Sequence, residues 1–250
     1  MISGHLSALI AKSSIEEVWA LHCAQMAQYG FDRLLYGFTR FRTASSYGDR
    51  KDALILSNHD PEYLEQFFAE DLVRNAPMVQ WSEQNSGACC WSYIDDLERS
   101  GLLSKGALKV LELNRKFDVT AGVTISFKDI AVGGFGAIGM AAVKGTTQAQ
   151  VQAIWDKHGR DLLLSNNIVH LRALTLPSPN RNRLTERQRE VLQWVANGKT
   201  IHEVSEVIGR KPATVEKHLR LAREAMNAET TAQAVLKASV QNQIFLDTLR

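Results

Sequence analysis

The sequence predicts an α+β protein, with an N-terminal α/β/α sandwich around an antiparallel sheet and a C-terminal helix-turn-helix domain of four helices. A chain of 250 residues is comfortable for two domains. Pro177 and Pro179 stand among polar residues between two helical patterns, and a proline disfavours helix in the residue before it. Strand-like runs occur only before this break. We therefore place the first domain at 1–174, a linker at 175–183 and the second domain at 184–250.

Helical and strand-like patterns are mixed along the first domain. Ser14 and Glu17 form a capping box that begins a helix ending near Gly30. Pro61 suits the first position of another helix, and Ser104 can cap a third. Short branched or aromatic runs predict strands at 33–41, 53–58, 122–127 and 135–143, the last two as an antiparallel pair. Helical patterns cover 61–73, 105–117 and 147–174, the last with an interruption near Gly159.

Four helical patterns make up the second domain. The first begins at the cap Thr185 and ends at Gly198, and the second begins at Thr200 and ends at Gly209. A three-residue turn that contains Gly209 leads to the third helix, which is the arrangement of a helix-turn-helix. The third and fourth helical patterns lie at 212–227 and 230–241.

The third helix of this domain, 212–227, has two distinct faces. Lys217 and Arg220 lie on one side of it. In a helix-turn-helix, the first residues of the second helix contact base edges and basic side chains hold phosphates. The pattern therefore predicts a helix that packs by one face and binds DNA with the other. Four apolar residues fall within about 40° of a common line on the packed side: Val215, Leu219, Ala222 and Met226.

Charge is unevenly divided along the chain, whose net charge is +2. From Arg181 onward there are twelve Lys and Arg and eight Asp and Glu, a net charge of +4, which leaves the rest of the chain at −2. A basic module attached to a slightly acidic body is typical of a domain that binds a polyanion such as double-stranded DNA.

Composition excludes several classes of protein. No apolar run approaches the roughly 20 residues that span a bilayer, and the N-terminus does not resemble a signal peptide. The three cysteines, Cys23, Cys89 and Cys90, make a poor disulfide framework and do not have the spacing of zinc ligands. We therefore expect a cytoplasmic protein with no membrane contact, no metal site and no cofactor.

The stretch "LTERQREVLQWVANGKTIHEVSEVIGRKPATVEKHLRLAREAM", residues 184–226, resembles the DNA-binding domain of the LuxR family of bacterial transcription regulators. Two departures are visible, because the family usually has a glutamate at Gln188 and a Lys-Leu pair at Ala225-Met226. Resemblance and helix geometry together predict seven DNA-binding residues: Thr200, Lys211, Ala213, Thr214, Lys217, His218 and Arg220.

The first domain is similar to the acyl-homoserine-lactone-binding domain of quorum-sensing LuxR regulators. This similarity rests on "YGFTRF", "SNHDPEYLEQFF", "APMVQW", Trp91 and "FDVTAGVTISF", which occur in the family's order and spacing. It implies a buried pocket for a small acyl signal, whose ring carbonyl and amide need hydrogen-bonding partners. The candidate ligand-binding residues are His59, Tyr63, Phe67, Ala76, Met78, Trp91 and Gly139.

This pocket departs from the family's pattern at its polar positions. The family has an aromatic N–H donor at Tyr63, a tyrosine at His59 and, at Ala76, a nearly invariant aspartate that accepts the amide N–H. A common hydroxyl position falls at Gly139. Two interpretations follow. Either an acyl-homoserine lactone binds in a modified way, or the protein binds another small apolar signal, or none.

The leading hypothesis is a ligand-responsive, DNA-binding transcription regulator that acts as a homodimer, because paired half-sites multiply the few base pairs that one helix-turn-helix reads. The expected dimer surfaces are the helices around Val151–Leu171 and Ala232–Val240, which have apolar residues to spare. One alternative is an enzyme with Cys89-Cys90 as nucleophile and His59 as base, although no orienting carboxylate is evident. Another is a protein that sequesters a second regulator.

Overall fold

The computed structural model describes residues 2–39, 52–69, 72–130, 134–176 and 183–244. The chain divides into two compact units, Met1–Leu174 and Thr175–Arg250. Most of the predicted linker, at 177–182, lies outside the described residues, as do the last two residues of the predicted strand 33–41. No helix in the described residues is long and apolar enough to cross a membrane.

The N-terminal unit is built on a five-stranded antiparallel sheet with the strand order β2-β1-β5-β4-β3. Pairing of β4 with β5 confirms the predicted antiparallel pair. Because successive side chains along a strand point to opposite faces, each central strand contributes to two different layers. The strands are β1 (Phe31–Thr39), β2 (Leu54–Ser57), β3 (Gly87–Cys90), β4 (Gly122–Ser126) and β5 (Phe135–Ala142).

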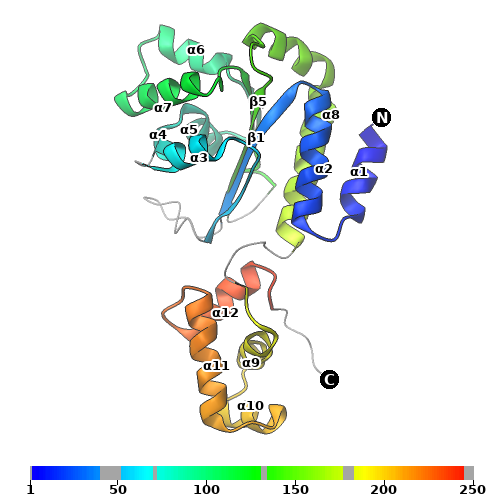
Figure 1. The fold of residues 1–250 in the computed structure, drawn as a ribbon, viewed down its shortest axis with the longest axis vertical. Coiled ribbons are helices and arrows are strands. Elements are labelled where there is room, and N and C mark those ends of the chain that lie inside the picture. The colour runs from blue at the N-terminus through cyan, green and yellow to red at the C-terminus, as the bar shows by residue number, and fades with distance from the viewer. Residues whose placement is uncertain (1, 40–51, 70–71, 131–133, 177–182, 245–250) are drawn as a thin grey trace. The chain divides into compact units, whose positions relative to one another are not determined.

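Helices cover both faces of this sheet (Figure 1). On one side α2 (Ile15–Gln28) and α8 (Gln148–Thr175) lie against the sheet, with α1 (Ile2–Ala11) outside them. The other side carries α3 (Pro61–Phe68), α4 (Leu72–Asn75), α5 (Pro77–Gln84), α6 (Ser92–Arg99) and α7 (Lys105–Lys116). The predicted α/β/α sandwich is confirmed.

Two predicted helices differ from the structure. The helix predicted at 61–73 ends at Phe68, because Ala69 is extended with φ −73° and ψ 163°, and α4 begins separately at Leu72. The interruption predicted near Gly159 is wrong, since α8 is continuous. Gly159 lies under the Trp155 indole, where a Cβ atom would come within 2.8 Å of the ring, so this glycine serves close packing rather than a break. The elements that the sequence patterns missed are α1, α5, α6 and β3.

A buried polar layer joins α2 and α8 to the sheet. His22 on α2 lies with Nε2 3.0 Å from Oδ1 of Asn166 on α8. Further along α8, His170 Nδ1 is 2.9 Å from the Tyr36 hydroxyl, and its ring stacks on Phe127 with centroids 4.2 Å apart. Burial lowers the pKa of His22 to about 4, so this imidazole is neutral at physiological pH. This face of the sheet is therefore filled by side chains.

The C-terminal unit consists of α9 (Glu186–Ala196), α10 (Ile201–Ile208), α11 (Pro212–Ala225) and α12 (Thr231–Val240). The four-helix prediction is confirmed, and so are the N-caps Thr185 and Thr200. Gly209 ends α10 with φ +64°, a left-handed conformation that glycine adopts without strain. All four residues predicted to form the packed face of α11 are buried in the core of this unit: Val215, Leu219, Ala222 and Met226.

Candidate ligand pocket and DNA interface

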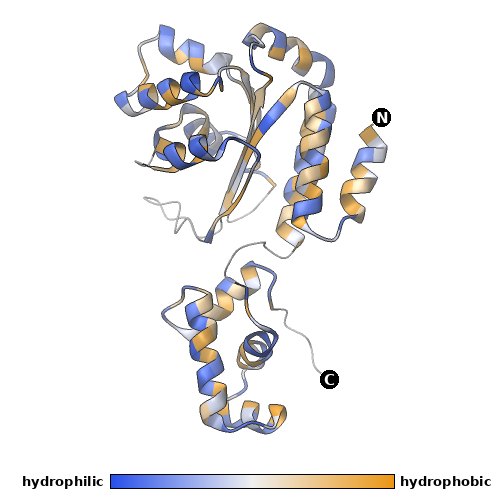
Figure 2. Ribbon diagram, viewed as in Figure 1, coloured by the Kyte–Doolittle hydropathy of each residue, from blue (hydrophilic) through white to orange (hydrophobic). Residues whose placement is uncertain are grey.

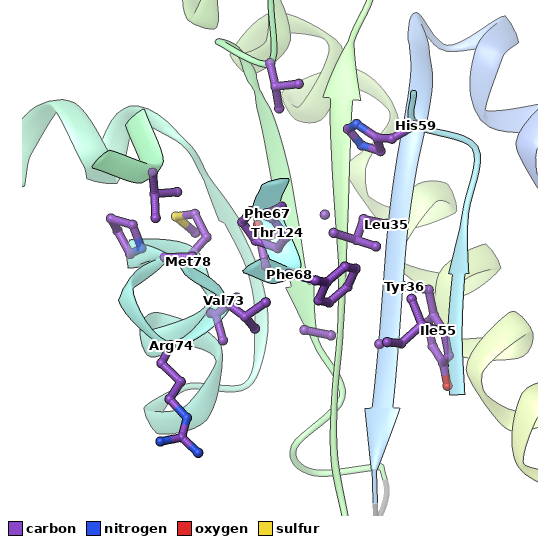
Figure 3. Close-up of a pocket in the computed structure, with 18 of the residues that line it drawn as sticks. Leu35, Tyr36, Ile55, His59, Phe67, Phe68, Val73, Arg74, Met78 and Thr124 are labelled. Carbon is purple, nitrogen blue, oxygen red and sulfur yellow. The ribbon is translucent and has the colours of Figure 1, made fainter. Parts of the chain in front are cut away.

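A cavity of about 340 Å³ lies on the face of the sheet that carries α3, α4, α5 and α7. Figure 3 shows its walls, with Leu35 and Thr124 on the sheet and Met78 and Val73 on the opposite helices. Its volume is within the range of about 300–1,000 Å³ that is usual for small-molecule sites. All seven candidate residues from the sequence line it: His59, Tyr63, Phe67, Ala76, Met78, Trp91 and Gly139.

The floor of the cavity is formed by the three central strands. Gly139 of β5 pairs with Leu35 of β1 on one side and with Thr124 of β4 on the other. Tyr36, the next residue along β1, turns its hydroxyl away from the cavity toward α8 (Figure 3). A Cβ atom at Gly139 would have no heavy atom closer than Trp91 at 3.9 Å, so the missing side chain there leaves part of the space for a ligand.

Trp91 forms one side wall and is held by the sheet. Its indole N–H donates a hydrogen bond of 2.9 Å to the Thr124 hydroxyl. Gly122 makes this position possible, because a Cβ atom there would lie 2.9 Å from the Trp91 ring and closer still to the Met140 carbonyl oxygen. Trp91 therefore presents an apolar surface to the cavity, and its own donor is already used.

Three aromatic rings follow one another along the beginning of α3. The rings of His59 and Tyr63 stack with centroids 4.8 Å apart, and those of Tyr63 and Phe67 with centroids 5.6 Å apart. The Tyr63 hydroxyl donates to Oδ1 of Asn114 on α7 at 3.0 Å. Burial raises the pKa of Tyr63, so its hydroxyl stays protonated. The helix start is secured by Asp60, whose side chain caps α3.

His59 is a polar lining residue whose ring is available to a ligand. Its side chain is buried, and in the part of the chain that the structure describes its ring makes no hydrogen bond. Burial, assisted by the positive charge of Arg33, lowers the pKa of His59 to about 4. A neutral imidazole offers one N–H donor and one nitrogen acceptor. His59 can therefore form one hydrogen bond of each kind with a ligand.

Ala76 and Met78 come from the beginning of α5. Ala76 occupies the N-cap position, is 6% exposed and supplies no side chain to cap the helix. Pro77 follows at the first helical position. None of the described residues that line the cavity is an aspartate or a glutamate. The described lining is therefore uncharged apart from Arg74, which is exposed.

Asn114 and Thr124 are polar lining residues that the sequence reasoning missed. The helical pattern could have indicated Asn114, because this residue follows Val110 by one turn on the buried face of α7. A strand signal for Thr124 existed too, because it alternates with Gly122 and Ser126 on one face of β4.

Cys89 and Cys90 lie on β3 and are not among the described residues that line the cavity. Burial raises the pKa of Cys89 to about 11 and also raises that of Cys90. Both thiols are therefore protonated and weakly nucleophilic at neutral pH. Among the described residues there is also no cluster of three His, Cys, Asp or Glu side chains that could hold a metal ion.

On the C-terminal unit, α11 alternates hydrophobic and hydrophilic residues along its length (Figure 2). Arg220 forms an exposed ion pair of 2.6 Å with Glu224, whereas Lys217 makes no ion pair with any described residue. The Thr200 hydroxyl is occupied at the start of α10, where it donates to Glu203 at 2.9 Å. Of the other candidates, the structure leaves four exposed and two half-buried: Lys211, Ala213, Lys217 and Arg220, and then Thr214 and His218.

Comparison with known proteins agrees with both the ligand pocket and the helix-turn-helix. Residues 14–173 match the autoinducer binding domain family, and residues 182–238 match the luxR family of bacterial regulatory proteins. The chain belongs to the luxR family of autoinducer-binding regulators. This luxR-family protein is therefore a DNA-binding transcription regulator of the quorum-sensing type and not an enzyme.

Individual relatives of this luxR-family protein are distant over the whole chain. The quorum sensing-dependent transcriptional regulator RpaR of Rhodopseudomonas palustris is 46% identical over 69 residues, which are 27% of this chain and 28% of that protein. The transcriptional activator LuxR of Aliivibrio fischeri is 21% identical over 196 residues, covering 78% of this chain and 76% of that protein. The solved structure of SdiA in complex with octanoyl-rac-glycerol aligns with a TM-score of 0.54 at 18% identity, covering 96% of this chain and 93% of that one, and it shows a shared fold.

Proposed function

We propose that this regulator binds a small acyl signal, an acyl-homoserine lactone or a related acyl compound, in the N-terminal cavity and thereby controls DNA binding by the C-terminal unit. The cavity carries the proposal, because seven residues chosen by resemblance line one space of about 340 Å³. Its aromatic and aliphatic walls suit an acyl chain, and its few polar groups suit a compact head group. The octanoyl compound bound by SdiA, a protein of the same fold, is in keeping with an acyl signal.

The experiment for this proposal is a mass spectrum of small molecules extracted from the purified protein. We expect an acyl compound in an amount close to one per chain, because a ligand that fills a buried cavity leaves slowly. If extraction yields nothing, and neither an acyl-homoserine lactone nor the matching oxygen-linked acyl ester raises the melting temperature of the protein, the proposal is wrong.

For DNA recognition, we propose that α11 enters the major groove and that its exposed side reads the site. Lys217 and Arg220 would make the strongest contacts, since both are basic and exposed. Thr200 would approach only the sugar-phosphate backbone of the DNA, near the N-terminus of α10, because its hydroxyl already donates a hydrogen bond to Glu203. The remaining proposed contacts are Lys211, Ala213, Thr214 and His218. We also propose that the protein acts in the cytoplasm, where it would meet its DNA.

We further propose that the protein is a homodimer and that α8 and α12 form its dimer interface. Leu164 and Leu171 on α8 are each 43% exposed and lie seven residues apart, so they share one face of that helix. Leu236 on α12 is 57% exposed. Sedimentation equilibrium at micromolar concentration should give twice the 27.9 kDa of one chain. Introducing Leu164→Glu and Leu171→Glu together should shift the protein toward monomer, and a wild type that is monomeric with and without DNA contradicts the proposal.

A further inference from the structure

Three of the described lining residues bring unused hydrogen-bond donors to the cavity. Thr124 accepts the indole N–H of Trp91, but its own hydroxyl hydrogen has no acceptor among the described residues. The side-chain amide of Asn114 accepts from Tyr63, and in the described chain its NH₂ group makes no hydrogen bond. His59 adds the N–H of its neutral ring. Donors thus reach the cavity from β4, α7 and the residue before the cap of α3.

The side-chain acceptors among the described lining residues are all uncharged. The His59 ring contributes one nitrogen. The neutral oxygens of Tyr63, Thr124 and Asn114 each keep a lone pair beyond the hydrogen bonds that they make. His59 lies across the cavity from Met78 on α5 (Figure 3), and Tyr63 is on α3. At the beginning of α5 the lining residue is Ala76, which has no polar atom in its side chain. No described lining residue supplies the carboxylate that would accept strongly from a buried N–H.

From this inventory we infer that the pocket recognises its ligand through the ligand's acceptor oxygens and makes no use of an amide N–H. This inference rests on the proposed function and narrows it. The ligands that fit are neutral acyl compounds rich in carbonyl and ester oxygens, including acyl esters and acyl lactones joined through oxygen as well as through nitrogen. A buried donor that finds no acceptor weakens binding by about 5- to 150-fold, so an N–H near α5 gives a ligand no advantage.

The test uses two series of ligands that differ only in the atom that joins the acyl group to the lactone ring, which is nitrogen in one series and oxygen in the other. N-acyl homoserine lactones of several chain lengths are compared with the matching 2-acyloxy-γ-butyrolactones, in which an ester oxygen replaces the amide N–H. Dissociation constants for the wild-type full-length protein are measured by calorimetry. We expect the ester to bind at least as tightly as the amide of the same chain length. An amide that binds ten times more tightly than its ester overturns the inference and leaves the proposed function standing.

A variant of Ala76 supplies the second half of the test. Ala76→Asp places a carboxylate at the N-cap of α5, where one oxygen can accept from the helix's own N–H groups while the other faces the cavity. We expect this variant to shift the ratio of amide to ester affinity in favour of the amide by about tenfold or more. Ala76→Asn introduces a side chain with the shape of aspartate but without its charge. It provides the same comparison if Ala76→Asp does not fold.

The remaining outcomes are also decisive. If Ala76→Asp and Ala76→Asn change the affinities of amide and ester by the same factor, the position does not face the linking atom of the ligand and the inference is wrong. If neither series binds the wild-type protein at any chain length, the inference and the acyl-lactone part of the proposed function fall together.

Discussion

Replacing Lys217 and Arg220 together by alanine is expected to weaken specific DNA binding by about 30-fold to 10⁴-fold. Good side-chain contacts to bases are worth about 1–3 kcal/mol each, and the two sites lie on the same exposed side of α11. Folding should be unaffected, because neither side chain belongs to the buried face that holds the helix in its domain. Fluorescence anisotropy with a labelled DNA site, measured at one salt concentration, gives the loss for each single and double variant.

Arg99→Ala is the matched control, since it removes one exposed positive charge from α6 of the N-terminal unit. Its DNA affinity should equal that of the wild type.

Salt dependence separates the two kinds of contact that α11 can make. A lysine that neutralises a phosphate reduces the slope of log K against log salt by about 1 when it is removed, whereas a base contact changes sequence preference. Unchanged affinity in the double variant would show that another surface binds the DNA.

Elements whose limits depend on neighbouring residues could be predicted from the sequence. Ser104 caps α7 by accepting from the Ala107 N–H at 3.0 Å, and Thr200 and Glu203 form a complete capping box at α10. These interactions lie within one helical turn, so the residue types and their spacing specify them.

Elements that depend on distant partners could not be predicted. The strand β3 has the sequence Gly-Ala-Cys-Cys, with no β-branched residue, and it exists because it pairs with Val123–Ser126 of β4. The unbroken course of α8 at Gly159 is a different case, because one glycine costs only about 1 kcal/mol of helical propensity and a helix of 28 residues tolerates it.

The candidate pocket shows the same division. Resemblance selected residues that do line the cavity, but only the structure shows which polar atoms are free. Trp91 and Tyr63 use their donors on Thr124 and Asn114, whereas His59 remains without a partner in the described chain. Such pairings join strands and helices far apart in sequence, and no periodicity reports them.

Filling the cavity from its floor is expected to abolish the response to ligand without unfolding the protein. Gly139 lies in the middle of β5, its φ is not in the left-handed region, and a Cβ atom there would have no contact closer than 3.9 Å. The series Gly139→Ala, Gly139→Val and Gly139→Leu therefore adds increasing volume to the cavity while β5 keeps its pairing with β1 and β4. Without ligand, the melting temperatures should stay near that of the wild type, because these changes add apolar contacts and create no backbone strain.

Ligand binding should fall along this series, with Gly139→Leu binding an acyl ligand about 100-fold more weakly than the wild type, since an overpacked site costs about 1–3 kcal/mol. At a free concentration of 100 times the wild-type dissociation constant, the ligand stabilises the wild-type native state by about 2.7 kcal/mol, and a 100-fold weaker variant retains about 0.4 kcal/mol. Thermal melts with and without ligand measure this difference directly.

Gly139→Ala is the internal control, because one methyl group at an open position should leave most of the ligand-induced rise in melting temperature intact. A full rise in melting temperature for Gly139→Leu would mean that the ligand binds outside this cavity. A loss of the rise that follows side-chain volume places the acyl group against β5, between Leu35 and Thr124.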